Sequence, residues 1–251
     1  MKKIMFAFWV LLFVSCIAMA ETDKEILFRG IPWGTEYPTV VNTLLNEGIK
    51  IREKMNMTTR TKLVKEIIEG GIDYANVFYG GGSENKNTIV SRAYPSANVV
   101  IGGNRVDCII LYFANSLNSE NEITSEEEYS KLFMACYEFN NMDVPSFTKE
   151  MIAKLTYLYG DVSDKKIIYQ GLDSKYIDKP KNENYIVYNS YIWHGTNDSL
   201  VILQTSDSKV LKSTNTVNIL YAWAGIDSLK TEYDNMYLTQ LFSDSNELDG
   251  L

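Results

Sequence analysis

Histidine is nearly absent from this sequence. The 251 residues contain one histidine, His194. A structural zinc site takes four ligands, mostly cysteine and histidine, and the chain has no ligand set with the required spacing. The G-x-S-x-G motif of serine hydrolases and the H-E-x-x-H motif of zinc proteases are missing as well. We therefore predict no metal, no cofactor and no catalytic residue. We expect His194 to end a strand beside a turn, a general base being its alternative role.

Cysteine is scarce too, with three in the chain, and only Cys108 and Cys136 lie beyond the N-terminal segment. Cys108 falls in an apparent strand, RVDCIILYF. Cys136 falls in an apparent helix, SEEEYSKLFMACYEF, which an S-x-x-E capping box opens at Ser125. Both side chains are predicted to point into the core. There they either form a disulfide between a strand and a helix or stay apart as small apolar residues.

Long apolar runs are confined to the N-terminus. Lys2 and Lys3 precede an apolar run over 4–14, and small residues follow at Ala18 and Ala20. These are the three parts of a secretory signal peptide, which predicts cleavage after residue 20. The run is shorter than the roughly 20 apolar residues of a transmembrane helix. We therefore expect an exported mature chain, residues 21–251, with no membrane insertion after cleavage.

The signal peptide predicts an extracytoplasmic location, either periplasmic or secreted. Export also brings the mature cysteines into an oxidising compartment, where a disulfide can persist. An alternative is a lipid anchor, because bacterial lipoproteins are cut just before a cysteine and Val14-Ser15-Cys16 suits such a site.

Basic residues are outnumbered: the chain has 24 Lys and Arg against 32 Asp and Glu, a net charge of −8. Removal of Lys2 and Lys3 with the signal peptide deepens this charge to −10. Nucleic-acid binding needs clustered basic residues, so we exclude a nucleic-acid partner. An acidic surface is also repelled by anionic lipid headgroups. The partner we expect is a protein or a small ligand.

The apolar spacing predicts helices and hairpin strands in an order typical of an α+β fold. We expect an antiparallel sheet of hairpins with helices packed on one side, because glycine turns rather than crossover helices join the strands. Besides the helix at Ser125, helices are predicted at 35–48, 63–71, 145–160 and from 228, and strands at 88–101, 105–114, 185–194, 200–205 and 217–223. The mature chain forms either a single domain over 21–251 or two helix-plus-sheet repeats with halves 21–120 and 121–251.

Aromatic residues are abundant, and the strand YIVYNSYIWH at 185–194 carries four of them, or five if its histidine is counted. One face of this strand shows Tyr185, Val187, Tyr191 and Trp193. Exposed tyrosine and tryptophan are typical of sugar or peptide recognition, so Tyr185, Tyr191, Trp193 and His194 are the candidate binding residues. The alternative is a central strand packed on both faces.

Several segments resemble a group of uncharacterised exported bacterial proteins. They are LFRGIPWGTEYPTVV after the signal peptide, CIILYFA, LTYLYGD and IWHGTNDSLVIL. The resemblance implies export and one continuous unit, and it assigns no site. The arrangement of elements also resembles the helix-plus-sheet repeats of the β-lactamase inhibitory protein and of a small outer-membrane assembly lipoprotein. This second likeness concerns architecture and implies no function.

These observations favour an exported soluble protein that acts as a non-enzymatic binding or interaction module of the cell envelope. One alternative is an exported hydrolase that uses carboxylates. Two carboxylates, or His194 and an acid, at the base of a deep pocket would favour it. Another alternative is a protein inhibitor or an envelope assembly factor, which predicts an exposed aromatic patch at Tyr185, Tyr191 and Trp193.

Overall fold

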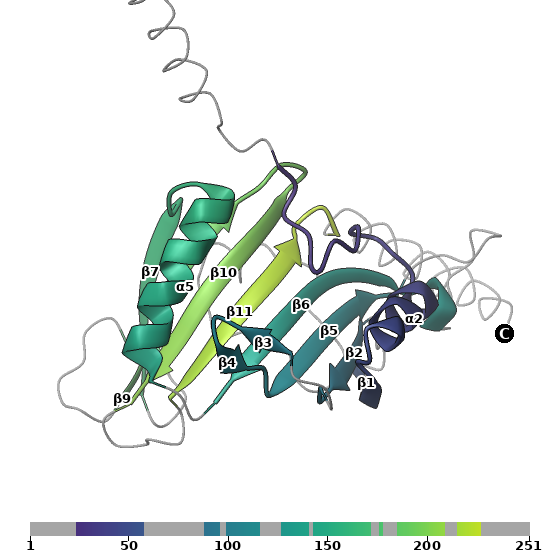
Figure 1. The fold of residues 1–251 in the computed structure, drawn as a ribbon, viewed down its shortest axis with the longest axis horizontal. Coiled ribbons are helices and arrows are strands. Elements are labelled where there is room, and N and C mark those ends of the chain that lie inside the picture. The colour runs from purple at the N-terminus through teal and green to yellow at the C-terminus, as the bar shows by residue number, and fades with distance from the viewer. Residues whose placement is uncertain are drawn as a thin grey trace, which may run out of the picture.

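The computed structural model of the chain describes residues 24–57, 88–95, 99–115, 127–140, 143–171, 176–177, 185–208 and 215–226. The predicted signal peptide, Cys16 and the helices predicted at 63–71 and from 228 lie outside these residues. The described part is mostly antiparallel sheet with two α-helices on one face, which confirms the α+β class (Figure 1). No helix in these ranges combines the length and the apolar composition needed to cross a membrane.

Nine strands form the main sheet, and all of its ladders are antiparallel. In order across the sheet they are β1 (Ile51–Met57), β2 (Thr88–Ala93), β5 (Cys108–Ala114), β6 (Lys131–Phe139), β11 (Thr216–Trp223), β10 (Ser199–Asp207), β9 (Tyr185–His194), β7 (Asp164–Gly171) and β8 (Tyr176–Ile177). The chain thus lays down one run of four strands from the β1 edge to β6 and a second run from β7 to β11. The two runs meet where β6 pairs with β11.

Turn chemistry explains two of the connections. Asn197 and Asp198 both have positive φ, 56° and 53°, as a type I′ turn requires, and they join β9 to β10. Gly102 and Gly103 also have positive φ, and they join the short strands β3 (Val100–Ile101) and β4 (Asn104–Arg105) into a separate hairpin. This hairpin lies over the helix-covered face of the sheet (Figure 1).

The helix α2 (Tyr37–Asn46) begins after Glu36, has a proline in its first turn and buries Val40 and Leu44. Thr35, the predicted cap, instead donates its hydroxyl to the carbonyl of Pro32 at 2.7 Å. The helix α5 (Val144–Tyr159) matches the prediction within one residue at each end. It buries a stripe of Phe147, Met151 and Leu155, as residues three and four apart share a helix face.

The helix predicted from Ser125 through Cys136 is wrong. Glu127–Tyr129 forms one turn of 3₁₀-helix, and Lys131–Phe139 is β6, a central strand between β5 and β11. Tyr137 and Phe139 belong to the core on the helix-covered face, whereas Cys136 belongs to the core on the opposite face. A strand buried on both faces is apolar throughout, so its residues also fit the spacing of an apolar helix face. Pairing with β5 and β11 makes this segment a strand.

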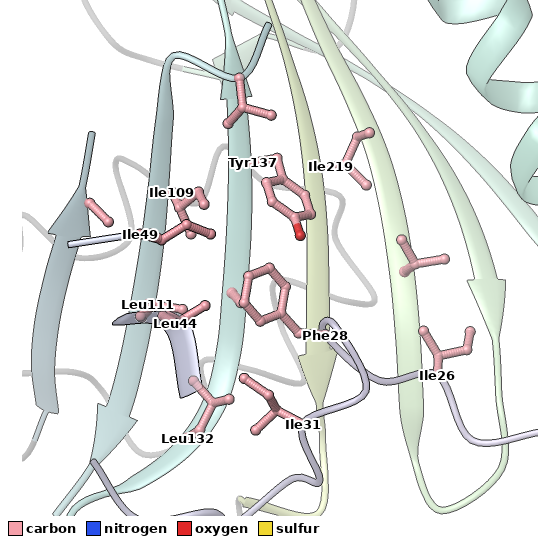
Figure 2. Packing of buried hydrophobic residues seen from close by; sticks show 14 of the residues in the cluster. Ile26, Phe28, Ile31, Leu44, Ile49, Ile109, Leu111, Leu132, Tyr137 and Ile219 are labelled. Atoms are coloured by element: carbon pink, nitrogen blue, oxygen red, sulfur yellow. The ribbon is translucent and has the colours of Figure 1, made fainter. Parts of the chain in front are cut away.

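The helix-covered face carries the larger core, and the N-terminal segment fills its middle. Ile26 and Phe28 have no exposed surface, and Figure 2 shows the Phe28 ring beside Tyr137 of β6. The ring centroids of Phe28 and Tyr137 are 5.1 Å apart. Burying a side chain of this kind contributes about 1.5–3 kcal/mol, so the segment after the predicted signal peptide is part of the folded core.

Candidate functional site: the cleft beneath α5

A cleft of about 660 Å³ opens between the first half of α5 and the sheet. One wall comes from α5 and the residue before it, and the floor comes from β9, β10 and the residue that precedes β11. The wall residues are Asp143, Val144, Pro145, Thr148, Lys149 and Ile152, and the floor residues are Asn189, Tyr191, Thr205, Asp207 and Asn215.

The α5 wall stands beside the stripe that anchors the helix. Thr148 and Ile152 are one helical turn apart, so they share a face next to the buried Phe147 and Met151. The Phe147 ring packs against Phe139 of β6 at 4.8 Å between centroids, which fixes this end of the helix on the sheet. The Thr148 hydroxyl donates to the Val144 carbonyl at 2.6 Å. The wall is therefore held in place by the Phe147 contact outside the cleft and by the Thr148 hydrogen bond within the wall.

The floor is built by strand alternation and register. Asn189 of β9 is paired with Thr205 of β10, and Tyr191 is paired with Leu203, so these side chains share the helix-covered face. Thr205 is buried, and Asn189 and Tyr191 are half-buried. Amide and hydroxyl groups thus replace apolar side chains at this end of the sheet, and they offer hydrogen bonds without a charge.

The charged lining residues are on the rim. Asp143, Lys149 and Asp207 are all exposed, and they line the cleft together with the neutral floor. The two carboxylates and one ammonium give the described lining residues a net charge of −1. None of the three makes an ion pair with another residue of the described ranges. These charges are available to a ligand.

Tyr191 already holds a cation from its own chain. The ammonium of Lys165, its partner on β7, lies 5.0 Å from the centre of the Tyr191 ring. A cation over the face of an aromatic ring is attracted by the ring quadrupole, an interaction of about 0.5–1 kcal/mol at exposed sites. Lys165 is exposed, so it leaves this ring face at little cost.

Of the four predicted binding residues, Tyr191 alone lines the cleft. Trp193 is completely buried, and its indole N–H donates to the Gly160 carbonyl at 3.1 Å, which holds the end of α5 on the sheet. Tyr185 is half-buried against Tyr169, with ring centroids 5.4 Å apart. The aromatic patch predicted for an inhibitor or assembly factor therefore lacks Trp193 and consists of two partly exposed tyrosines.

His194 ends β9 on the opposite face of the strand from Tyr191 and Trp193. Its side chain is exposed and does not line the cleft. Its backbone N–H donates to the Ser163 hydroxyl at 3.3 Å. The predicted position at a strand end beside a turn is confirmed. Among the described residues, neither His194 nor any other position belongs to a cluster of three or more His, Cys, Asp or Glu side chains that could hold a metal ion.

Cys108 and Cys136 are both buried and both free thiols in the structure. They lie on the same face of adjacent strands, with Cys108 paired with Glu138 and Cys136 paired with Ile110. The strand-to-helix geometry predicted for them is wrong, because Cys136 is on β6. Burial, followed by the Glu138 carboxylate, raises the pKa of the Cys108 thiol to about 12, so this thiol is not a nucleophile at neutral pH. A disulfide between them stays a prediction.

A second polar cluster, on Arg29, has a structural role that the sequence did not indicate. Arg29 has φ 53°, and its Nε donates to Glu47 at 2.6 Å while a second nitrogen donates to the Tyr137 hydroxyl at 3.1 Å. Burial raises the pKa of Tyr137, and Arg29 partly opposes this shift. The cluster ties the N-terminal segment to the end of α2 and to β6, and its donors are used by the protein itself.

The sequence contains one signal for the cleft besides Tyr191. Asn189 and Thr205 are polar residues at inward positions of strands that are otherwise apolar on that face. Such positions are either hydrogen-bonded in a core or open to a cavity.

No protein-family model, no curated protein and no solved structure matches this chain.

Proposed function

We propose that this chain is a non-enzymatic binding module of the bacterial cell envelope and that the cleft beneath α5 is its ligand site. The observation that carries the proposal is the composition of the cleft. Its volume, about 660 Å³, lies in the range of small-ligand sites. A floor of amide, hydroxyl and aromatic groups beneath a charged rim provides the few oriented polar contacts that such sites use for specificity.

The environment of the charged groups supports binding over catalysis. Asp143 and Asp207 are both exposed, so neither carboxylate has the buried setting that is common for a catalytic acid. The Cys108 thiol is buried on the other face of the sheet, and His194 does not line the cleft. The described residues that line the cleft are therefore suited to orienting a ligand.

We also propose export and an internal repeat. The signal-peptide pattern of residues 1–20 supports export to an extracytoplasmic location. The chain order supports the repeat, because α2 is followed by the strand run that ends at β6 and α5 by the run that ends at β11. The boundary between halves then lies near residue 140 rather than 120, since β6 completes the first run.

The test is an NMR titration of the mature chain, residues 21–251, with four probes: maltotriose and the Nα-acetyl amides of lysine, glutamate and norleucine. We expect at least one probe to shift amide signals at the start of α5 and in β9 and β10. Thr148→Trp fills the cleft and should weaken that binding by about tenfold or more, a loss of about 1.4 kcal/mol.

Thr156→Trp is the matched control, because Thr156 is on the same helix and does not line the cleft. It should leave the affinity unchanged. Shifts that persist equally in both variants place the ligand elsewhere and overturn the proposal. The absence of localised shifts with all four probes overturns it as well.

A carboxylate hydrolase is the second candidate. The observation that favours it is that Asp143 and Asp207, from different elements, line the same cleft. Glycoside hydrolases use a pair of carboxylates in this manner, one as acid and the other as base or nucleophile. If the chain hydrolyses p-nitrophenyl glycosides, both Asp143→Asn and Asp207→Asn should abolish turnover. Turnover that survives either change excludes this mechanism.

A further inference from the structure

The electrostatics of the cleft select the charge of its ligand. Asp143 stands immediately before α5 and Asp207 ends β10, and both side chains line the cleft. Figure 1 shows that the start of α5 lies beside the end of β10. Lys149 is the one cation among the described lining residues, and Lys165, whose ammonium lies over the Tyr191 ring, is a second cation beside them that a cationic ligand would displace. Once Lys165 has left the ring, the two carboxylates outnumber Lys149 among these residues, and the site then attracts a cation.

The N-terminus of α5 does not reverse this preference. A helix N-terminus normally favours anions, because unpaired backbone N–H groups and the helix dipole point toward them. In α5 the residue at the N-cap is Asp143, whose carboxylate carries the opposite charge. Pro145 in the first turn has no N–H to donate. The Asp143 side chain makes no capping hydrogen bond, and its negative charge at this end of the helix opposes the binding of an anion there.

The floor of the cleft indicates what accompanies the cation. The Tyr191 ring binds an ammonium in the structure, that of Lys165 at 5.0 Å, which shows that this ring face accepts a primary amine on an aliphatic stem. Ile152 adds an apolar surface for such a stem, and Asn189 offers both an amide donor and an amide acceptor. This combination suits a basic side chain attached to a peptide-like backbone.

Building on the proposed binding function, we infer that the cleft takes a ligand with a primary amine or guanidinium on an apolar stem, as in a lysine or arginine side chain of a peptide. The carboxylates of Asp143 and Asp207 supply the counter-charge. Tyr191 and Ile152 contact the stem, and Asn189 binds the neutral amide portion. The ligand amine competes with Lys165 for the face of Tyr191.

The test compares the mature chain's affinity for Nα-acetyl-lysinamide with its affinity for Nα-acetyl-norleucinamide, which has the same stem without the charge. We expect the lysine probe to bind about tenfold tighter. Raising the NaCl concentration from about 0.05 M to about 0.5 M should weaken the lysine probe alone, because salt screens exposed charges.

Three variants locate the effect. Asp143→Asn and Asp207→Asn should each weaken the lysine probe about threefold to tenfold, as expected for a charge contact near a protein surface. Asp161→Asn, in the exposed turn after α5 and outside the cleft, makes the same change in net charge and should have no effect. Lys165→Met removes the internal competitor and should tighten the lysine probe.

Equal binding of the two probes overturns this inference. So does an equal loss with Asp161→Asn, because the whole-chain charge would then be responsible. If maltotriose or the norleucine probe shifts the same cleft signals and the lysine probe binds no better, the cleft is a site for a neutral ligand and the proposed binding function still holds. If no probe shifts the cleft signals, both proposals fail.

Discussion

The contact between the β3–β4 hairpin and α5 can be tested with two neighbouring glycines. Gly102 and Gly103 have φ of 59° and 72°, which alanine adopts at a cost of about 1–2 kcal/mol. Alanine at either position pays this backbone cost. The two positions differ in what a side chain would meet, so their difference isolates the packing of the hairpin.

A Cβ atom at Gly102 would lie 3.0 Å from Met151 Sδ and 3.1 Å from a ring carbon of Phe147. Both neighbours are buried, and the Phe147 ring is fixed against Phe139, so they yield only with displacement of α5 or the hairpin. Overpacking of this kind costs about 1–3 kcal/mol. A Cβ atom at Gly103 would meet nothing within 4 Å. We therefore expect Gly102→Ala to destabilise the mature chain by about 1–3 kcal/mol more than Gly103→Ala.

Urea unfolding of the two variants, analysed at equal m-value, measures this difference. For a chain of this size a loss of 1 kcal/mol also lowers the Tm by about 2–4 °C. Because α5 forms one wall of the cleft, Gly102→Ala should in addition weaken whichever probe binds there. Equal destabilisation by the two substitutions would refute the docking of the hairpin on α5.

Three further predictions concern the core. Phe28→Ala removes a fully buried ring that packs on Tyr137, and it should cost about 3–5 kcal/mol in urea unfolding, whereas Tyr157→Ala, at a side chain 89% exposed, should cost less than about 0.5 kcal/mol. A small loss at Phe28 would show that the N-terminal segment is not part of the core. Burial raises the pKa of Cys108 to about 12, so between about pH 9 and pH 12 the folded thiol keeps a proton that the unfolded thiol loses. The free energy of unfolding should therefore fall as pH rises above about 9. Cys108→Ala should reduce that fall, and an unchanged pH profile would contradict the shift. Alkylation in urea without reductant should modify both cysteines, and a requirement for reductant would instead establish the Cys108–Cys136 disulfide.

The elements that the sequence predicts well are those with one clear periodicity. The strand predicted at 185–194 has the same bounds as β9, because its aromatic and apolar residues are flanked by turn residues on the C-terminal side. The strands β10 and β11 are predicted within about two residues at each end. For α5, an apolar stripe, a proline in the first turn and a terminal glycine with φ 84° all agree.

The elements that the sequence misses lack that periodicity for two opposite reasons. The strand β6 is buried on both faces, so its apolar residues satisfy a helical as well as an extended spacing. The strands β1 and β7 are charged, with Lys165 and Lys166 in β7, and neither shows an apolar alternation. Charged side chains are common near the edges of sheets, where they oppose pairing with another chain. Both strands are set by pairing with a neighbour, which one segment's sequence does not encode.

The candidate site, like the fold, is predicted only where strand alternation determines it. Alternation along β9 predicts correctly that Tyr191 and Trp193 share a face, but their exposure depends on where α5 crosses that face. The carbonyl of Gly160 accepts the Trp193 N–H and brings the end of the helix down over the indole. Tyr191, two residues earlier, lies beside the half of the helix that carries Thr148 and Ile152. One of two equivalent positions in the sequence is thus core and the other is cleft.

The cleft exists because the anchors of α5 are all on one side of the helix or at its end. Trp193 holds the last turn, and the stripe of Phe147, Met151 and Leu155 holds the side that faces the middle of the sheet. On the other side, β9 and β10 present Asn189 and Thr205, which are too short to fill the space that phenylalanine or leucine would occupy. Asn189 and Thr205, being small and polar, therefore both leave the space of the cleft open and supply its hydrogen-bonding groups. Apolar residues at these two positions would stabilise the fold better, which supports the proposal that the cleft binds a ligand.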